Sequence, residues 1–471
     1  MMKIDKKIFG SFVEHIENCI EGGLIESDTR AINKDALDLC KELKPSVLRF
    51  PGGTVMGIYH WQDYVGPIEG RKKVKNIVWG GMMCREFGTA EFVQYCREIG
   101  AEPMICVNMP TGSAEEAAAW VEYCNGTEDT HYANMRREHG YEEPFNVKYW
   151  CIGNESFAEP DLGVQHEIAT YIREAWEYTK YMKMTDPTIE LVYVGNGADA
   201  EWNKAVLDSL SPVCDYLSIH FYASTENVDG GQGATERKSI TESQCFGQLR
   251  NFENGDIAAI EKLIDQYNEK SEPINKWLRI PGRSHQIKIA LDEWNIWNTT
   301  PNEKSPYGLY QEYTWSDALW TAEFIIFMLR HAEHIGIANL AQMVNVIAPI
   351  MVDERGAWKQ TTFYPFKYFR EYCGEYTDDL DCMNNDQYDD SNITTFMSFT
   401  DNERILFAVN KGSNPDETIT FAGKKSIIIT AEDLMAVNDY GNDKVHVLID
   451  DKSFDEKKIP AWSIAILVGD K

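Results

Sequence analysis

Two glutamates in this chain stand in settings that suit acid-base chemistry. Glu155 closes the string Gly153-Asn154-Glu155, and Glu293 lies in Asp292-Glu293-Trp294. Each of them ends an apolar run of strand length. Two carboxyl groups over one pocket can divide labour when their surroundings push their pKa values apart. One then stays ionised as a nucleophile while the other delivers a proton to a leaving oxygen, which is the chemistry of glycosidic bond cleavage.

Polar and aromatic residues near other run ends could complete such a site. Asn154 and Gln342 carry amides that both donate and accept hydrogen bonds, which suits sugar hydroxyls. Arg49 is expected to orient a carboxylate, and His220 could be a metal ligand, a base or a positioning group. Candidates for stacking on a sugar ring are Trp61, Trp79, Tyr222, Trp294 and Trp297. His15 and His60 do not complete a metal triad, so no metal and no cofactor are expected.

Eight apolar runs, most of which end in a polar or ionisable residue, must position these side chains. They are 8–14, 47–53, 103–108, 147–155, 189–196, 216–222, 288–295 and 340–349. The runs are continuously apolar, as strands buried on both faces require, and helical periodicity separates them. Eight strand-helix units favour a closed (β/α)8 TIM barrel over an open sheet. In such a barrel the carboxyl ends of all strands meet on one face, where the active site lies.

The rest of the chain predicts one insertion and one further domain. The mostly polar stretch 224–286, with an amphipathic segment at 257–267, follows the sixth run and is expected to overhang the barrel mouth. Short alternating runs from about Thr377 onward predict a C-terminal antiparallel β-sandwich. We therefore predict an α/β barrel over residues 1–372 and a β-sandwich over residues 373–471.

Charge and composition bound the partners and the compartment. The 75 acidic and 45 basic residues give a net charge of −30, which disfavours nucleic acid and anionic membranes as partners. Eleven scattered cysteines without metal-type spacing are expected to be reduced core thiols. No signal-peptide-like or membrane-spanning apolar stretch is evident. A cytoplasmic protein with a small-molecule or oligosaccharide substrate is the expectation.

Several strings together resemble glycoside hydrolase family 51, the α-L-arabinofuranosidases. The resemblance runs from about residue 4 to residue 372. It is carried by Phe9-Gly10-Ser11-Phe12-Val13-Glu14-His15, Leu48-Arg49-Phe50-Pro51-Gly52-Gly53, Tyr59-His60-Trp61, the segment from Phe145 to Trp150 with Gly153-Asn154-Glu155, Asp292-Glu293-Trp294-Asn295, and Ala338 through Pro349.

The resemblance implies a retaining exo-hydrolase that releases a terminal furanose, most simply α-L-arabinofuranose, from plant-derived oligosaccharides or glycosides. Glu155 would be the acid/base and Glu293 the nucleophile. The furanose subsite would contain Glu14, Arg49, Thr54, Asn154, His220, Tyr222 and Gln342, with Trp79, Trp294 and Trp297 as aromatic neighbours. A homo-hexamer of barrel-plus-sandwich subunits is implied as well.

Three departures from the family pattern stand out. Thr54 occupies the position after the paired glycines where the family usually has a sugar-contacting asparagine. The segment 156–160 lacks the usual stretch after the acid/base, so the leaving-group side is expected to be reshaped. The chain also starts almost at the first barrel strand, and the strand that commonly joins the sandwich from the N-terminus is expected to be missing.

Other functions remain open on the sequence alone. The same mechanism could act on galactofuranose, apiose or xylose, because Thr54 offers one hydroxyl in place of an amide. A non-catalytic sugar-binding barrel is a second hypothesis, although such a protein needs neither a proton donor nor a nucleophile. A metal-dependent barrel hydrolase is a third.

Overall fold

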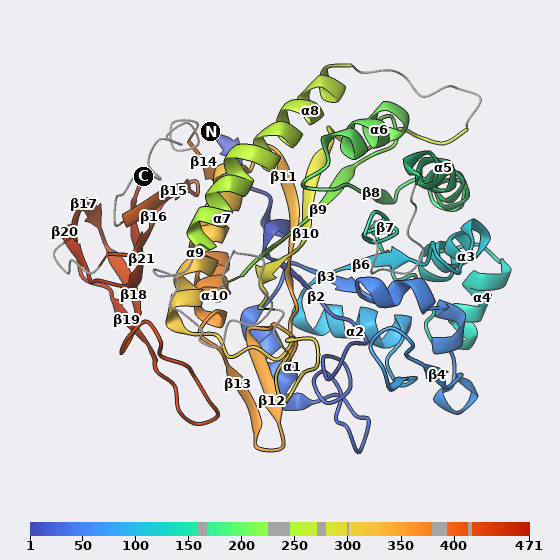
Figure 1. Cartoon of the computed structure of the whole chain (residues 1–471), viewed down its shortest axis with the longest axis horizontal. Coiled ribbons are helices and arrows are strands. Elements are labelled where there is room, and N and C mark those ends of the chain that lie inside the picture. Colours follow the sequence, from blue (N-terminus) through green and yellow to red (C-terminus); the bar gives the residue numbers. More distant parts are fainter. Residues whose placement is uncertain (159–166, 225–244, 271–278, 299–300, 379–392, 413–416) are drawn as a thin grey trace.

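The structure is a computed structural model of the chain, and it describes residues 1–158, 167–224, 245–270, 279–298, 301–378, 393–412 and 417–471. Its centre is a closed barrel of eight parallel strands (Figure 1). They are β2 (Gly10–Phe12), β3 (Val47–Phe50), β6 (Glu102–Val107), β7 (Tyr149–Ile152), β8 (Glu190–Val194), β9 (Tyr216–Ala223), β10 (Lys288–Ile296) and β11 (Ile335–Ala341). All eight predicted runs contain or adjoin a barrel strand, which confirms the predicted fold. The last strand begins at Ile335, earlier than the predicted Leu340.

Helices surround the barrel and follow the predicted periodicity. They are α1 (Lys34–Leu43), α2 (Thr89–Ile99), α3 (Ala114–Asn125), α4 (His131–Glu138), α5 (Ile168–Thr185), α6 (Ala200–Leu210), α7 (Cys245–Asn251), the π-helical η5 (Phe252–Ile257), α8 (Ala258–Glu269), α9 (Trp315–Arg330) and α10 (Phe363–Tyr372). Side-chain caps fix several starts: Asn33 accepts from the Ala36 N–H, and Ser113 accepts from the Glu116 N–H. Within the described residues, no helix combines the length and apolarity that crossing a membrane requires.

The loops contain several short helical turns and strand pairs. These are the 3₁₀ turns η1 (Lys6–Phe9), η2 (Thr54–Ile58), η3 (Trp61–Tyr64) and η4 (Ile68–Gly70), and the two-stranded pairs β4 (Val74–Lys75) with β5 (Met82–Met83) and β12 (Ile350–Asp353) with β13 (Gly356–Lys359). The β12–β13 hairpin follows β11 and therefore extends from the end of the barrel where the strand carboxyl ends lie (Figure 1).

The core has two layers separated by the barrel wall. Side chains from alternate strand positions, including Val47, Met104, Cys151, Val192 and Ile337, fill the barrel interior as one cluster. The opposite strand faces pack against the surrounding helices in a much larger cluster. The ten cysteines within the described ranges are buried thiols outside any disulfide, as expected of core residues.

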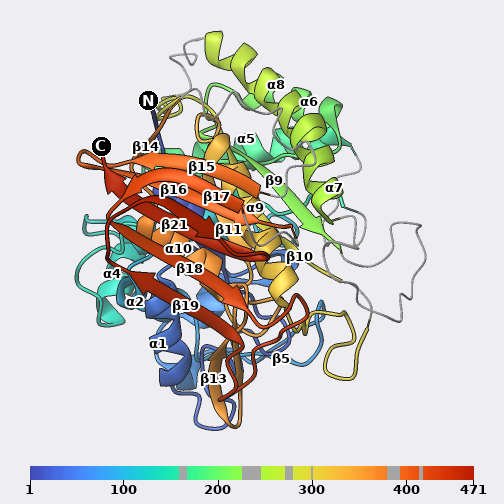
Figure 2. The ribbon, with the colours of Figure 1, turned by 90° about the vertical axis from the view of Figure 1, so that its left-hand side faces the viewer.

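A second, antiparallel sheet packs beside the barrel, as Figure 2 shows. Its order is β1 (Met2–Lys3), β14 (Tyr376–Thr377), β15 (Ile393–Phe399), β16 (Glu403–Asn410), β21 (Ser463–Asp470), β18 (Lys425–Ala431) and β19 (Val445–Asp450). A further pair, β17 (Glu417–Gly423) with β20 (Phe454–Ile459), covers part of it through an apolar cluster with Leu406 and Leu467. The sandwich prediction is confirmed, whereas the boundary at residues 372 and 373 stays a prediction.

The N-terminal strand that we expected to be missing is present. Met2 pairs with Thr377, and Lys3 pairs with Tyr376, in antiparallel register. Lys6 supports this junction, because its ammonium donates to the Gly374 carbonyl at 2.9 Å. The prediction of a missing strand is therefore wrong. Two residues are too few to produce an alternating pattern, so no sequence period marked this strand.

The amphipathic segment at 257–267 does not lie over the barrel mouth. It covers the last residue of η5 and most of α8, which continue α7 along the outside of the barrel, with α7 beside α9 and α8 beside α6 (Figure 1). This long helix is the ordinary crossover between β9 and β10. The stretch 225–244, which follows β9, and the stretch 271–278 lie outside the described residues.

A buried histidine-carboxylate cluster fastens this crossover helix to the end of α9. His331 Nε2 lies 3.1 Å from Glu253 Oε1, and its Nδ1 lies 2.6 Å from Glu261 Oε1. Burial lowers the pKa of His331, but the two carboxylates more than offset burial and raise its pKa to about 9. His331 is therefore protonated at neutral pH.

Because of this cluster, the free energy of unfolding should fall as the pH becomes alkaline. A folded-state pKa raised from 6.5 to about 9 gives stability that is complete below pH 6.5 and is lost as the pH rises through 9. The size is roughly 3 kcal/mol at full protonation. Denaturant unfolding of the parent at pH 6 and pH 10 should reveal this loss, and His331→Gln should lack it. His446→Gln, on an exposed part of β19, is the matched control and should behave like the parent. Equal pH dependence in all three proteins would contradict the prediction.

Candidate active site

A cavity of about 250 Å³ opens at the carboxyl ends of the barrel strands. Its lining residues are Phe12, Glu14, Ile16, Gly53, Thr54, Trp79, Asn154, Glu155, Ala158, Tyr222, Glu293, Trp297, Leu309, Gln342 and Ile347. They come from the ends of β2, β3, β7, β9, β10 and β11 and from the loops that follow. The volume lies just below the usual range for small-molecule pockets, so the cavity suits one small ring.

A bulge in β10 decides which of its side chains face the cavity. Ala290 pairs with Ser218 and Glu293 pairs with His220, so β10 holds one more residue than β9 over this stretch. Bulges of this kind re-aim side chains. As a result Asp292 and Glu293 both contact residues inside the barrel, whereas Trp294 faces outward.

Glu293 is held by a cation and a phenol. Arg49 Nη1 donates to Glu293 Oε1 at 2.7 Å, and the Tyr222 hydroxyl donates to Oε2 at 2.7 Å. Arg49 Nη2 also donates to Asn154 Oδ1 at 2.6 Å. Arg49 is buried, 1% exposed, and does not line the cavity. Arg49 and Tyr222 together hold the Glu293 carboxylate in place through both of its oxygens, and an orienting role of Arg49 stays a prediction.

Glu155 faces Glu293 across the cavity and bonds to His220. His220 Nδ1 lies 2.7 Å from Glu155 Oε1, and a carboxylate oxygen of Glu155 lies within 4.8 Å of one of Glu293. The Glu155 side chain is 27% exposed against 8% for Glu293. Glu155 is thus the carboxylate that water reaches more easily. Its backbone φ of 38° lies in the left-handed region, which costs energy for a residue with a side chain.

The charges of this pair are coupled. Burial raises the pKa of Glu155, but the hydrogen bond and positive charge of His220 outweigh burial and hold that pKa below its usual range. Burial lowers the pKa of His220, but the charges of Glu293 and Asp292 and the bond to Glu155 raise it well above normal. The proton shared by Glu155 and His220 therefore resides on the imidazole.

Glu14 forms the opposite wall. Its Oε1 accepts from the Val55 N–H at 2.9 Å and from Trp79 Nε1 at 3.1 Å, while Gln342 Nε2 donates to Oε2 at 3.2 Å. Burial is the main cause that raises the pKa of Glu14 to about 6. Gly52 allows this approach, since its φ is +144° and a Cβ there would lie 2.2 Å from Glu14 Cγ. Gln342 Oε1 is buried and has no hydrogen-bond partner within the described part of the chain, so it can accept from a ligand hydroxyl.

Most of the remaining predicted site residues lie at the cavity or directly beside it. Thr54, Trp79, Tyr222 and Trp297 line the cavity, with the Tyr222 and Trp297 rings 5.5 Å apart. His220 lies beside it as the partner of Glu155. Ala158, in the segment expected to reshape the leaving-group side, also lines the cavity, while residues 159 and 160 lie outside the described residues.

The prediction of sugar stacking is wrong for two tryptophans. The Trp294 ring is fully buried and stacks on Phe324 of α9 at 4.6 Å, because the β10 bulge turns it away from the cavity. The Trp61 ring is buried against Trp120, and its Nε1 donates to the Glu116 carbonyl. Both tryptophans are core residues.

Residues that the sequence analysis left without a role lie beneath the cavity. Asp292 Oδ1 accepts from the Ser218 hydroxyl at 2.5 Å and lies 3.4 Å from His220 Nε2, and Asp292 Oδ2 lies 3.4 Å from Arg49 Nε. The arginine and histidine around it lower the pKa of Asp292 against the raising effect of burial. The period-two spacing of Ser218, His220 and Tyr222 could have revealed Ser218, but no sequence signal marks the bulge that brings both Asp292 and Glu293 inside.

One cluster could in principle attract a cation. Among the described residues, donor atoms of Glu155, His220 and Glu293 lie within 4.8 Å of one another. Hydrogen bonds to Arg49, Tyr222 and between His220 and Glu155 already engage these atoms, as an acid-base pair requires. The expectation of a site without metal or cofactor stays a prediction.

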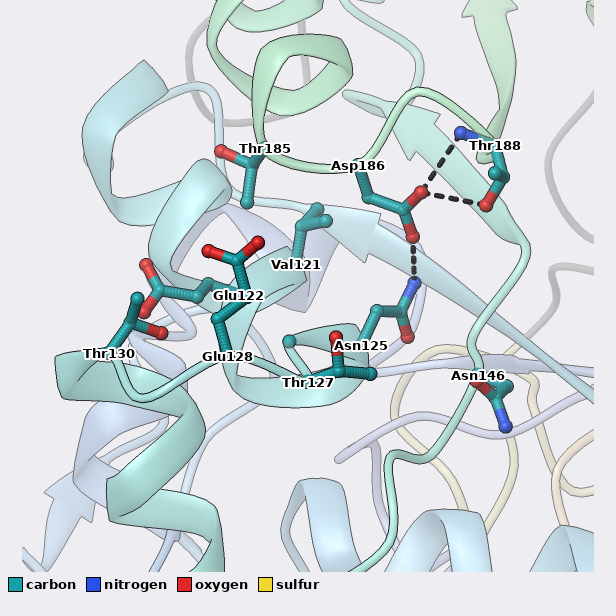
Figure 3. A pocket seen from close by; sticks show the side chains of 11 residues that line it. Val121, Glu122, Asn125, Thr127, Glu128, Thr130, Asn146, Thr185, Asp186 and Thr188 are labelled. Carbon is teal, nitrogen blue, oxygen red and sulfur yellow. Dashed lines mark hydrogen bonds between the residues drawn. The ribbon is translucent and has the colours of Figure 1, made fainter.

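A larger polar cavity of about 470 Å³ lies where α3 and α5 end (Figure 3), at the face opposite the strand carboxyl ends. Its side chains bond to one another: Asn125 Nδ2 donates to Asp186 Oδ2, and Asp186 Oδ1 accepts from Thr188. Among its described lining residues there is no aromatic ring on which a sugar could stack. The smaller cavity at the strand carboxyl ends is the candidate active site.

Known glycosidases resemble this chain in sequence and in structure. Residues 39–239 match the family model for the alpha-L-arabinofuranosidase 1 domain, and residues 292–463 match that for the alpha-L-arabinofuranosidase C-terminal domain. A probable alpha-L-arabinofuranosidase C of Aspergillus niger is 37% identical, over 80% of this chain and 73% of the relative. An intracellular exo-alpha-(1->5)-L-arabinofuranosidase of Halalkalibacterium halodurans is 35% identical, over 79% of this chain and 73% of the relative.

Solved structures agree over nearly the full length. The alpha-L-arabinofuranosidase of Thermotoga maritima, determined as an arabinose complex, is 30% identical with a TM-score of 0.81, covering 100% of this chain and 98% of that chain. The GH51 alpha-L-arabinofuranosidase of Thermotoga petrophila RKU-1 is 29% identical with a TM-score of 0.82 and the same coverage. The barrel, its companion sheet and these similarities together place the chain in glycoside hydrolase family 51, the α-L-arabinofuranosidase family, as a glycosidase.

Proposed function

We propose that the protein is a retaining exo-hydrolase that releases terminal α-L-arabinofuranose from oligosaccharides or small glycosides. The observation that carries this proposal is the facing carboxylate pair, with oxygens of Glu155 and Glu293 within 4.8 Å across a cavity for one sugar ring. A short separation suits retention, whereas inverting enzymes need roughly 6.5 Å or more to fit a water molecule. The names of the relatives support arabinofuranose as the sugar.

The proposed reaction takes two displacements. Glu293, fixed by Arg49 and Tyr222, attacks the anomeric carbon while the Glu155–His220 pair delivers its proton to the departing oxygen. The glycosidic bond breaks and an ester to Glu293 forms. The deprotonated pair then takes a proton from water, whose oxygen attacks the same carbon and releases the sugar with net retention.

Three groups are proposed to hold the sugar hydroxyls. Glu14 accepts hydrogen bonds, Gln342 offers a buried carbonyl oxygen, and Asn154 adds an amide next to the acid/base. Trp79 and Trp297 form apolar walls on which a ring face can rest. The ring-sized volume favours a monosaccharide unit in the cavity, which supports exo action.

Activity on a panel of 4-nitrophenyl glycosides tests the function. The α-L-arabinofuranoside should give the highest kcat/KM, above the β-D-galactofuranoside, the apioside and the β-D-xylopyranoside. Folded protein that hydrolyses none of the four would overturn the proposal. A higher kcat/KM for another sugar would replace arabinofuranose while leaving the two-carboxylate mechanism intact.

Thr54→Asn tests whether the departure from the family pattern tunes selectivity. Thr54 lines the cavity next to Gly53, so a longer amide there should reach the sugar hydroxyls. One added hydrogen bond is worth about 1 to 2 kcal/mol, which is about tenfold in the ratio of kcat/KM for the arabinofuranoside over the xylopyranoside. Thr130→Asn, in the polar cavity at the far end of the barrel, is the matched control and should leave the ratio unchanged. An unchanged ratio in Thr54→Asn would remove Thr54 from the sugar subsite.

Setting and assembly are part of the proposal. The Halalkalibacterium relative is named as an intracellular enzyme, which supports cytoplasmic placement. A homo-hexamer is inferred from the family resemblance alone, and sedimentation or light scattering of the purified protein would test it. The net charge of −30 supports a substrate other than nucleic acid or membrane.

A further inference from the structure

Asp292 connects the two catalytic carboxylates from beneath the cavity. It is 1% exposed and touches neither face of the sugar pocket. One of its oxygens pairs with Arg49, which in turn binds Glu293. The other faces His220, which in turn binds Glu155. A single buried carboxylate therefore supports both halves of the site.

The contacts around His220 fix its orientation and its protons. Its Nδ1 faces Glu155 at 2.7 Å, with Glu293 farther away at 3.6 Å. Its Nε2 faces the Ser218 hydroxyl at 3.3 Å and Asp292 at 3.4 Å. Because the Ser218 hydroxyl donates its proton to Asp292, its oxygen remains an acceptor for the Nε2 proton. Both ring nitrogens thus meet acceptors, as an imidazolium requires.

We propose that Asp292 is a positioning residue for the acid/base step, which holds His220 as the store of the proton that Glu155 delivers. This inference rests on the proposed function. The proton leaves His220 Nδ1, crosses to Glu155 Oε1 and is transferred to the glycosidic oxygen as the bond to the sugar breaks. In the second displacement a water proton returns through Glu155 to His220, so the pair ends each cycle with one proton.

The charged groups that face His220 are Glu155 from the end of β7 and Asp292 and Glu293 from β10, with Arg49 of β3 behind Asp292. Asp292→Asn keeps the size of the side chain and one acceptor oxygen, but it removes the negative charge and so weakens the hold on the His220 proton. An opposite charge at this distance shifts a pKa by about one unit or more.

Asp292→Asn is the test variant, with kcat/KM measured against pH on two α-L-arabinofuranosides. One has a poor leaving group, 4-methoxyphenol, and the other an activated one, 2,4-dinitrophenol. The alkaline limb for the poor leaving group should move down by about one pH unit or more, while the activated substrate should lose far less rate at its optimum. Equal losses on both substrates with an unmoved alkaline limb would overturn the proposal, because Asp292 would then act only through Arg49 and Glu293.

Two further measurements separate this inference from the proposed function. Nuclear magnetic resonance of the His220 ring nitrogens reports the proton directly, whether or not the protein turns over, and its titration should move to lower pH in Asp292→Asn. An unmoved titration contradicts the inference even if the parent is a good arabinofuranosidase. Ser218→Ala should move the titration in the same direction by a smaller amount. Asp208→Asn, on the surface of α6, is the control variant and should match the parent in pH profile.

Discussion

A Glu293→Ala variant should lose at least about 10⁴-fold in kcat on 4-nitrophenyl α-L-arabinofuranoside, because no other group can form the glycosyl ester. Glu293 is 8% exposed and held by Arg49 and Tyr222, and no second carboxylate among the described residues shares those two contacts. Azide should restore part of the rate. It fits the space left by the carboxylate and attacks from the same side, so the product should be the inverted arabinofuranosyl azide.

Glu116→Ala is the matched control for this variant. Glu116 is a partly buried glutamate that also pairs with a histidine, His60, but it does not line the cavity. Its removal should leave kcat within about twofold of the parent. Substitutions of paired side chains outside the active site change mainly the free energy of unfolding. Residual activity of Glu293→Ala near that of the control, or an azide product of retained configuration, would contradict the assignment.

A Glu155→Ala variant should separate substrates by their need for a proton. For a poor leaving group such as 4-methoxyphenol, kcat/KM should fall by about 10³-fold, since general acid catalysis contributes 10² to 10⁴. For the 2,4-dinitrophenyl glycoside kcat/KM should fall by less than about tenfold, because that phenol departs without protonation. Measuring both substrates with one enzyme preparation cancels any loss of folded protein.

Azide should also act on Glu155→Ala, but with the opposite stereochemistry. The ester to Glu293 still forms, and the anion attacks it from the side of the missing acid/base, which gives the azide of retained configuration. The two variants therefore predict two different products from the same substrate and anion. Equal losses of kcat/KM on both leaving groups would show that Glu155 is not the proton donor.

The barrel was predictable because its strands leave a strong signal. Each strand is buried on both faces and reads as a continuous apolar run, and the carboxyl ends of these runs meet at the mouth. Glu14, Asn154 and Glu155 lie at the ends of two such runs and line the cavity. Their assembly needs only the fold, because every carboxyl end of a parallel barrel points the same way.

The errors arose where local geometry departs from regular strands. One extra residue in β10 turns Glu293 inward beside Asp292 and Trp294 outward, and no local pattern of residue types reveals an insertion in the pairing. The two residues of β1 pair with a strand more than 370 positions away, which no short-range period can indicate. The sequence shows that the connection after β9 is long, but it does not show on which side of the barrel the connection lies. The prediction of an insertion over the mouth is therefore wrong for residues 245–269, which form the helical crossover.

The anomeric configuration of the first product tests the central claim most directly. Proton magnetic resonance during the first minutes of hydrolysis of an α-L-arabinofuranoside, before mutarotation, distinguishes the two forms of the sugar. Facing carboxylates within 4.8 Å predict that the α anomer appears first and the β anomer only later. Initial appearance of the β anomer would contradict a double displacement through Glu293 and Glu155.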